Sequence, residues 1–448
     1  MLNQLANKEQ GQTLVVIALV IVALLGFAGV ALDGGNIYAE QRHAQAAADS
    51  AVLAAAYKAM RGATAYADLR QAAMSNAAQN GYDNNSVNNW VVFYNPPIDG
   101  TYIGNPKYYE VIITRIVPTT LAHLVYQGPW QVTVHAVAKW RPPVDQVPFS
   151  GQAIMATSPS ACQALWFHGT GNVLVNGAGV FSNSNCPSGS CSGGPSSSAG
   201  VANGNGSVTV VGGNIGTVGG FYIGGSSSAS PAPQSCQAPL PLQVCPPLPT
   251  PAECGSPWAL VPSGDATLSP GTYPEISVGS NKTVKLRKGI YCLNGQLGDL
   301  QGTLTTDLNG NGIQDADEGA MLYISNPNGD VIRSNAQTNV VLWALQDTTW
   351  RGMAIYAPTT PCGVACGTPG GPACSTAVIN GGADSDIVGT IYMPGTNLSV
   401  NGNSGTLALH SQIIANTVDV AGTGGVTVVY DPNVIYAMPI PPAVTLVK

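Results

Sequence analysis

The feature that most constrains this chain is an uncharged apolar segment near its start, residues 12–32, QTLVVIALVIVALLGFAGVAL. A helix needs about 20 such residues to cross a hydrocarbon layer about 30 Å thick. The segment therefore predicts a transmembrane helix in contact with membrane lipid. The alternatives are a buried core helix, which needs apolar protein on all sides, and a cleaved signal peptide, whose apolar core spans only about 7–15 residues.

The cysteines indicate on which side of the membrane the rest of the chain lies. All ten follow the apolar segment, between Cys162 and Cys374. An even number of cysteines in a Gly/Ser/Pro-rich region is typical of disulfides in an oxidising compartment. Lys8 adds a weak preference for a cytoplasmic N-terminus. We expect residues 1–11 to be a cytoplasmic tail and the bulk to be extracytoplasmic or on the cell surface, held by a single-pass anchor.

The composition argues against a nucleic-acid partner. Charged residues form 9% of the chain, against about 25% in ordinary soluble domains. The 16 Lys and Arg are scattered, so no basic patch is present to displace counterions from phosphates.

Residues 33–143 predict a small α+β domain. The membrane helix continues to about residue 62 with a stripe of small residues at three- and four-residue steps, Ala44, Ala47, Ala48, Ala51, Val52 and Ala55. A second helix precedes Gly81, and residues 90–94, 108–117 and 130–140 predict antiparallel strands. Residues 118–126 predict a short helix, and Pro142–Pro143 marks the boundary.

Residues 144–448 predict an all-β domain, in which short β-branched runs alternate with Gly/Asn turns. LSPGTY (268–273) is echoed by LRKGIY (286–291), and GMAIYAPTT (352–360) by GTIYMPGT (389–396). A period near 18 to 20, doubled in the second case, favours a parallel β-solenoid. A β-sandwich is the alternative. We interpret residues 183–260 as a Cys/Pro/Gly-rich excursion.

One loop matches the pattern of a calcium site. Residues 307–318, DLNGNGIQDADE, place Asp307, Asn309 and Asn311 at positions 1, 3 and 5, Ile313 at 7, Asp315 at 9 and Glu318 at 12. Gly312 occupies the turn position. The loop resembles the DxDxDGxxDxxE loops of extracellular proteins, and Asn at two positions predicts weak, structural Ca²⁺ binding. A metal-free polar hairpin is the alternative.

Catalytic patterns are absent from the sequence, which predicts that the chain is not an enzyme. The histidines are far apart, and no GxSxG, P-loop or HExxH pattern occurs. Cys362, Cys366 and Cys374 lack a fourth zinc partner. Asp384 and Asp386 are the one close carboxylate pair in the later coils, as expected of a polar turn. The alternative is a carbohydrate-active enzyme, which needs Asp or Glu clustered with Arg or Lys on adjacent coils.

The first sixty residues resemble the TadE/TadG-like proteins of the Flp (Tad) pilus-assembly system. The matching positions are Gly11, Gln12, Asp33, Gly35, Tyr38, Arg42, Gln45, Ala48, Asp49 and Leu53 to Ala56. The resemblance implies an anchored protein with pilus-assembly or envelope partners, acting in pilus biogenesis, surface assembly or adhesion, with a surface glycan as a possible ligand.

Two departures from the family pattern bear on function. Members processed as pilins carry Glu five residues after the cleavage-site glycine, and Val16 stands there in this chain. The resemblance therefore favours a permanent anchor over cleavage after Gly11 and incorporation into a filament as a pseudopilin. The Asp-x-Ser-x-Ser metal motif of larger relatives does not occur, so the β-rich region is a different domain.

Overall fold

The computed structural model describes residues 6–121, 128, 130–242, 246–258, 264–325, 329–335, 338–358, 374–381, 384–402 and 407–447. The chain forms two compact units, Met1–Val144 with Ile440–Lys448, and Asp145–Pro439. The return of the last residues to the first unit departs from the single β domain expected over 144–448. It arises because β30 (Ala443–Val447) pairs antiparallel with β3 (Trp130–Arg141).

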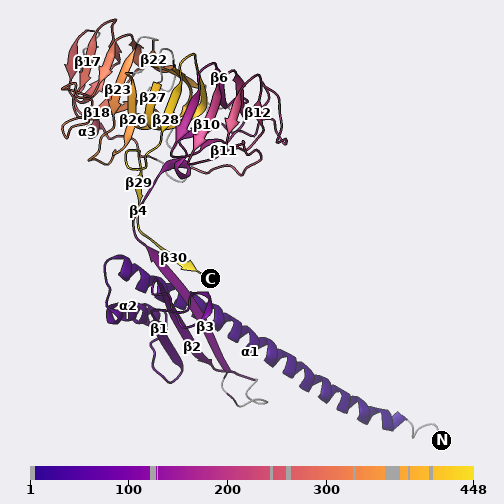
Figure 1. Ribbon diagram of the computed structural model, residues 1–448. Helices are drawn as coiled ribbons and strands as arrows, with labels where there is room; N and C mark the ends of the chain where they lie inside the picture. Colours follow the sequence, from indigo (N-terminus) through magenta and orange to yellow (C-terminus); the bar gives the residue numbers. More distant parts are fainter. Residues whose placement is uncertain are drawn as a thin grey trace. The chain divides into compact units, whose positions relative to one another are not determined.

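The first unit begins with the 55-residue helix α1 (Ala6–Met60), the long ribbon at the N-terminal end of Figure 1. Its span Thr13–Met60 is long and apolar enough to cross a membrane, with a mean hydropathy of 3.0 over a window that is only 6% buried. Leu14, Leu25 and Phe27 are more than 60% exposed. Side chains this apolar are unfavourable in water, so they fit a lipid environment.

Beyond the apolar span, α1 and α2 (Tyr66–Gln79) pack on a four-stranded antiparallel sheet. The sheet has the order β1 (Asn89–Tyr94), β2 (Tyr108–Val117), β3, β30. The two longer predicted helices and the three predicted strands are confirmed, and the stripe of small α1 residues is buried in this core. Pro118–Leu121 are not helical, and the rest of the helix expected over 118–126 lies outside the described residues. A 3-10 turn, η1 (Gly100–Tyr102), follows β1.

The second unit is a stack of coils with up to three strands each. Strand pairing links most strands to the strand three places later, and all the pairs that are described in this unit are parallel. This is the arrangement of a parallel β-solenoid, whereas a sandwich of the kind considered above consists of antiparallel sheets. Inward Val, Ile and Leu side chains fill its centre.

The strands form three parallel sheets, which we call sheets I, II and III, and β26 (Asp386–Gly402) and β27 (Leu407–Gly422) run through all three. Sheet I also contains β14 (Ala266–Leu268), β17 (Thr283–Leu286), β20 (Thr303–Thr305), β23 (Asn339–Trp343), β28 (Val426–Val429), β7 (Val173–Asn176), β10 (Ser207–Val211) and β13 (Ser228–Ser230). Sheet II contains β15 (Gly271–Tyr273), β18 (Gly289–Leu293), β21 (Ala320–Ile324), β24 (Met353–Tyr356), β5 (Ile154–Ala156), β8 (Val180–Ser182) and β11 (Ile215–Thr217). Sheet III contains β16 (Ile276–Val278), β19 (Leu297–Leu300), β22 (Asp330–Ser334), β25 (Ser375–Gly381), β6 (Leu165–Gly169), β9 (Gly200–Gly204) and β12 (Phe221–Ile223).

The coil order in space is not the order in sequence. β28 pairs with β7, and β27 pairs with β5 and β6. One coil therefore combines β28 from the end of the unit with β5 and β6 from its beginning, and we call it the seam coil. In Figure 1 the yellow strands β27 and β28 accordingly lie between orange β26 and magenta β10. The unit is thus a circularly permuted solenoid, whose chain ends leave from its middle.

The two poles of the solenoid are formed by the middle of the sequence, at β12–β13 and at β14–β16. The chain passes from one pole to the other between β13 and β14, and we call its described residues 231–242 and 246–258 the crossing segment, which includes α3 (Pro251–Cys254). The crossing segment covers an apolar cluster on the outer side of sheet II, to which Leu240 and Leu242 contribute. The Tyr356 hydroxyl donates to the carbonyl of Pro246 at 2.8 Å. Entry and exit strands β4 (Val144–Gln146) and β29 (Met438–Ile440) pair with each other, and η3 (Pro148–Gly151) follows β4.

Two sequence interpretations need correction. The excursion expected over 183–260 includes the regular coil strands β9 to β13, because their Gly and Ser residues form tight stacked corners. The 37-residue echo is one coil and not two, since Met353 in β24 pairs directly with Thr390 in β26. The 18-residue echo holds for Leu268 and Leu286.

Candidate functional site

The predicted calcium loop, residues 307–318, follows β20 and closes on itself through hydrogen bonds. Asp307 accepts from the backbone N–H groups of Gly310 at 2.6 Å and Gly312 at 2.9 Å. Glu318, which is 2% exposed, accepts from the N–H groups of Leu308 and Asp315 at 2.7 and 2.9 Å. Positive φ angles at Gly310 and Gly312 permit this tight path.

The remaining predicted ligands lie at the exposed rim of the same loop. The side-chain amides of Asn309 and Asn311 both donate to one Asp315 oxygen, at 2.7 and 3.1 Å. The N–H of Ile313 donates to the Asn311 side-chain oxygen at 2.8 Å. Asn309, Asn311, Ile313, Asp315 and Glu318 therefore belong to one connected hydrogen-bond network, whereas the Asp307 carboxylate bonds separately to the Gly310 and Gly312 N–H groups.

Two lysines border the loop and bond to its backbone. Lys285 donates to the carbonyl of Leu308 and Lys288 to that of Ala316, both at 2.7 Å. Among the described residues, which include the whole loop, no group of three or more His, Cys, Asp or Glu side chains is arranged to hold a metal ion. The N–H donors and lysines satisfy the loop as it stands, although each carboxylate oxygen retains further lone pairs.

A cluster that sequence reasoning missed lies on sheet III. Arg333 contacts Asp330 at 2.8 Å and Asp299, on the adjacent coil, at 3.5 Å. Coil stacking brings these residues together across 34 positions of sequence, so no local motif signals them. Arg333 and Asp299 are at least half exposed, and an exposed ion pair of this kind contributes little to stability.

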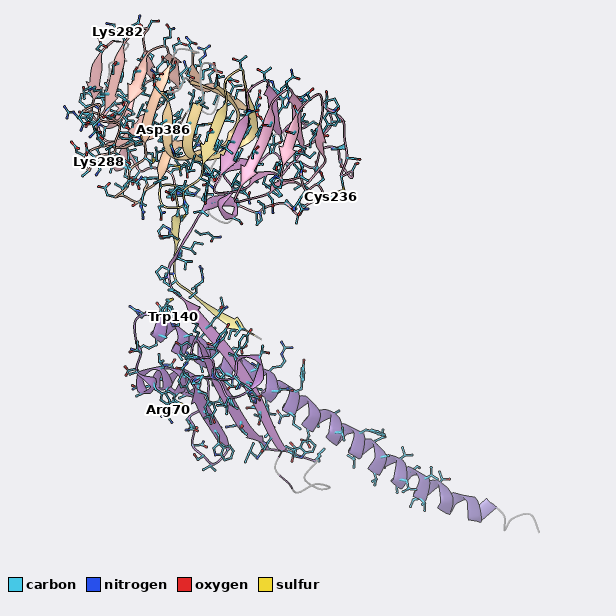
Figure 2. The ribbon with its side chains drawn as sticks, viewed as in Figure 1. Arg70, Trp140, Cys236, Lys282, Lys288 and Asp386 are labelled. Carbon is cyan, nitrogen blue, oxygen red and sulfur yellow. A yellow bond between two sulfur atoms is a disulfide. The ribbon has the colours of Figure 1, made fainter. Side chains whose placement is uncertain are left out.

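Two histidine–aspartate pairs also join neighbouring coils. The His410 ring contacts the Asp386 carboxylate at 2.8 Å. Asp386, which was interpreted as part of a polar turn, therefore begins β26 and pairs with a residue of β27. His168 contacts Asp419 at 2.8 Å. Burial raises the pKa of the Asp419 carboxyl, and the neighbouring His168 opposes that rise. Figure 2 shows Asp386 between Cys236 near one pole and Lys282 and Lys288 near the other.

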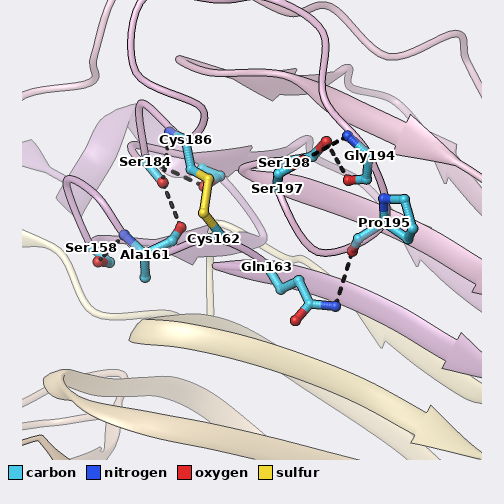
Figure 3. The surroundings of a disulfide bond; sticks show 11 residues. Ser158, Ala161, Cys162, Gln163, Ser184, Cys186, Gly194, Pro195, Ser197 and Ser198 are labelled. Atoms are coloured by element: carbon cyan, nitrogen blue, oxygen red, sulfur yellow. Dashed lines mark hydrogen bonds between the residues drawn. A yellow bond between two sulfur atoms is a disulfide. The ribbon is translucent and has the colours of Figure 1, made fainter.

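Three disulfides join Cys162–Cys186, Cys191–Cys236 and Cys254–Cys292. Figure 3 shows the surroundings of the first, where the Ser184 hydroxyl donates to the carbonyl of Ala161 at 2.6 Å. Cys374 is disulfide-bonded, which contradicts a zinc role for its thiolate. Cys362 and Cys366 lie outside the described residues. Disulfides are typical of an extracytoplasmic protein.

The residues that carry the Tad resemblance have structural roles in the first unit. Asp33 accepts from the backbone N–H groups of Thr120 and Leu121 at 2.8 and 2.9 Å. Gln45 donates to Asp49 at 2.8 Å and to the carbonyl of His135 at 3.0 Å. Gln45, Asp49 and His135 line a cavity of about 440 Å³. Arg42 stacks on the Tyr38 ring at 5.9 Å.

Comparison with known proteins assigns this N-terminal region. Residues 11–60 match the family described as putative Flp pilus-assembly TadE/G-like. No curated protein matches the chain, and no solved structure does. The β-rich region is therefore assigned to no family.

Proposed function

We propose that this chain, whose residues 11–60 are TadE/G-like, is a membrane-anchored protein of the Flp/Tad pilus-assembly type that displays a non-enzymatic β-solenoid outside the membrane. The family match over an exposed apolar helix carries the proposal. The disulfides of the second unit support the extracytoplasmic side. The solenoid would serve pilus biogenesis, surface assembly or adhesion.

The state of the N-terminus tests the anchor. Val16 replaces the glutamate expected of a processed pilin, so we expect mass spectrometry of the purified membrane protein to find residues 1–11 still attached. A mature N-terminus at Gln12 would overturn the anchored form in favour of a pseudopilin. Protease added to intact cells should digest the second unit, and its protection until lysis would contradict the orientation.

Replacement of the solenoid separates biogenesis from adhesion. Because β4 and β29 pair, a short loop joining Gln146 to Met438 should leave the first unit intact. We expect pili to disappear from a deletion strain and to return when this shortened chain is supplied. Surface attachment should return only with the full chain. Normal piliation in the deletion strain would contradict a role in biogenesis.

A carbohydrate-active enzyme is the second candidate function. Asp299, Asp330 and Arg333 provide the carboxylates and cation on adjacent coils that such an enzyme needs. A screen of the full chain against neutral and acidic polysaccharides tests it, with Asp330→Asn as the variant. Product release abolished by Asp330→Asn would establish the enzyme, and absence of any product would favour the non-enzymatic function.

We also propose that Ca²⁺ binds the loop of residues 307–318 in a structural role. The support is the set of oxygen-bearing side chains that one short loop brings together, Asp307, Asn309, Asn311, Asp315 and Glu318, with the Ile313 backbone carbonyl as the sixth ligand. We expect millimolar Ca²⁺ to raise the unfolding temperature of wild type and not of Glu318→Gln, since extracellular sites bind at about 10⁻⁴–10⁻³ M. Glu275→Gln is the matched control. Equal unfolding temperatures of wild type with Ca²⁺ and with chelator would contradict the site.

A further inference from the structure

A cavity of about 500 Å³ lies where the chain enters and leaves the solenoid. Its floor is made by the corners between sheets I and II on the two successive coils that follow the seam coil, the corner between β7 and β8 and the corner between β10 and β11. In the seam coil this corner is missing, because β28 ends at Val429 and the chain leaves through Tyr430, while η3 leads into β5. The hollow is therefore a direct result of the circular permutation.

Glycines let the backbones of the stacked corners in this floor approach closely. A Cβ at Gly213 would lie 2.1 Å from the backbone of Gly179, and a Cβ at Gly177 would lie 2.3 Å from the Tyr430 carbonyl. Gly177 and Gly212 also have φ angles of 97° and 84°. Close stacking of the corners thus requires glycine and exposes main chain to the cavity.

The crossing segment forms a fixed wall of the cavity. Asn183 donates to the carbonyl of Leu240 and accepts from its N–H, both at 2.8 Å. The backbone of Gln234 pairs with that of Gly216 as an added parallel bridge, and Cys236 is tied to Cys191. A wall held in this way is preorganised, which reduces the entropy lost on binding.

The lining combines polar and apolar groups and carries no charge. Its hydrogen-bonding side chains are Ser150, Gln152, Asn214, Gln234, Gln237 and Tyr430, and none of the described lining residues is Asp, Glu, Lys, Arg or His. Amides both donate and accept hydrogen bonds, as sugar hydroxyls do. Phe181 and Tyr430 add aromatic surface. A volume of this size lies within the range of about 300–1,000 Å³ typical of ligand sites.

Tyr430 has a hydroxyl available for a ligand. This hydroxyl has no hydrogen-bond partner in the described part of the chain. A Cβ atom at position 151 would lie 2.6 Å from the hydroxyl oxygen, so any residue other than Gly151 would displace the Tyr430 side chain. Burial raises the pKa of Tyr430 to about 12, so the hydroxyl remains a neutral donor at physiological pH.

We propose that this cavity binds a neutral glycan, a short oligosaccharide held by the amides and the Tyr430 hydroxyl. The ligand class follows from the uncharged lining, the aromatic surface and the main-chain floor. It rests on the proposed display of the solenoid outside the membrane, where surface glycans lie. No catalytic step is involved.

Saturation-transfer NMR on the full chain in lipid nanodiscs tests this proposal. The nanodiscs are prepared without sugar-based detergents, which would compete with the probes. The probes are cellotriose, maltotriose and chitotriose, with trigalacturonate as the anionic control. We expect saturable binding of at least one neutral trisaccharide, and at least tenfold weaker binding of trigalacturonate. Absence of binding by all three, or equal binding of the anion, would overturn the proposal.

Three variants test whether the trisaccharide binds in the cavity. Gln237→Trp fills the hollow from its exposed wall and should abolish binding. Asn214→Ala removes one amide and should weaken binding about fivefold, as expected for one hydrogen bond. Asn205→Ala, an exposed asparagine outside the lining, should bind like wild type. Unchanged binding in Gln237→Trp would overturn the site. Piliation of the Gln237→Trp strain should remain normal, so failure of the glycan site and failure of the pilus function are separable.

Discussion

Asp33 shows how a single side chain connects the long apolar helix α1 to the rest of its unit. It is 3% exposed, and it accepts two backbone N–H groups from the connection between β2 and β3. Its position directly after the apolar span explains why a carboxylate is found there. A charge at the end of the membrane segment is acceptable because it is fully hydrogen-bonded.

Asp33→Asn should loosen this connection. The amide keeps one acceptor oxygen and loses the charge, so we expect a loss of about 1–2 kcal/mol in the free energy of unfolding. Faster proteolysis within residues 118–129 should accompany it. Thermal unfolding and limited digestion in nanodiscs measure both effects. The exposed Asp145→Asn is the control, and an equal effect there would contradict the assigned role.

Glu253 gives the crossing segment a pH dependence. It accepts from the N–H of Thr250 at 2.7 Å, from the Thr250 hydroxyl at 2.8 Å and from the Trp350 indole at 3.0 Å. The bond from the Thr250 N–H, above all, lowers the pKa of Glu253. On acidification, the Glu253 carboxylate is therefore protonated at a higher pH in the unfolded chain than in the folded chain. The stability that Glu253 supplies is therefore complete above its ordinary pKa and is lost as the pH falls through the lowered value.

Glu253→Gln should remove that dependence. At neutral pH we expect a slightly lower unfolding temperature than wild type, since the side chain is exposed and screened by solvent. The difference should shrink as the pH falls below the ordinary pKa of a glutamate and vanish below the lowered pKa of Glu253. Thermal unfolding followed by circular dichroism over a series of acidic pH values measures it, with Glu275→Gln as control. A difference independent of pH would show that the carboxylate charge is not responsible.

At the scale of elements, the small residues of α1 set how closely the helix approaches the sheet. Ala44, Ala48 and Ala51 are fully buried against it. Alanine leaves no room for a longer side chain in a core packed at ordinary density. The same stripe was predicted from its spacing, because helical periodicity is a local property of the sequence.

Ala48→Leu should push α1 away from the sheet. Overpacking of this kind costs about 1–3 kcal/mol. Ala46 lies on the exposed side of the same turn, so Ala46→Leu is the matched control and should change stability by less than about 0.5 kcal/mol. Chemical denaturation in nanodiscs measures both variants, and equal losses would mean that the buried stripe is not closely packed.

The parts of the fold that were predictable depend on local pattern. Alternation in residues 108–117 and 130–140 and the Gly-rich turns of the coils each reflect neighbouring residues. The pairing of β28 with β7 and of β30 with β3 joins segments more than 250 residues apart, and no periodicity encodes it. The neutral cavity follows from the β28–β7 pairing, so it was equally hidden. The Asp299–Arg333 contact joins neighbouring coils across 34 positions, and no local motif signals it either.

For the whole molecule, the circular permutation predicts that the connections can be exchanged. The ends of the second unit, Asp145 and Pro439, lie in the paired strands β4 and β29. Joining these two residues by a short linker and opening the chain after Leu242 should give a solenoid that unfolds within a few degrees of the original. Circular dichroism tests this. Opening the chain within β21 should prevent folding. If the permutant opened after Leu242 does not fold, the pairing of strands at the seam coil is contradicted.

The length of the crossing segment must match the number of coils between the two poles. Neither pole carries a chain end, so coils can be gained or lost in evolution without disturbing the strands that leave the seam coil. Each added coil separates the poles by about 4.8 Å, which an extended proline-rich chain covers with one to two residues at about 3.1 Å each. A relative with more coils should therefore carry a proportionately longer crossing segment, and the two lengths should vary together.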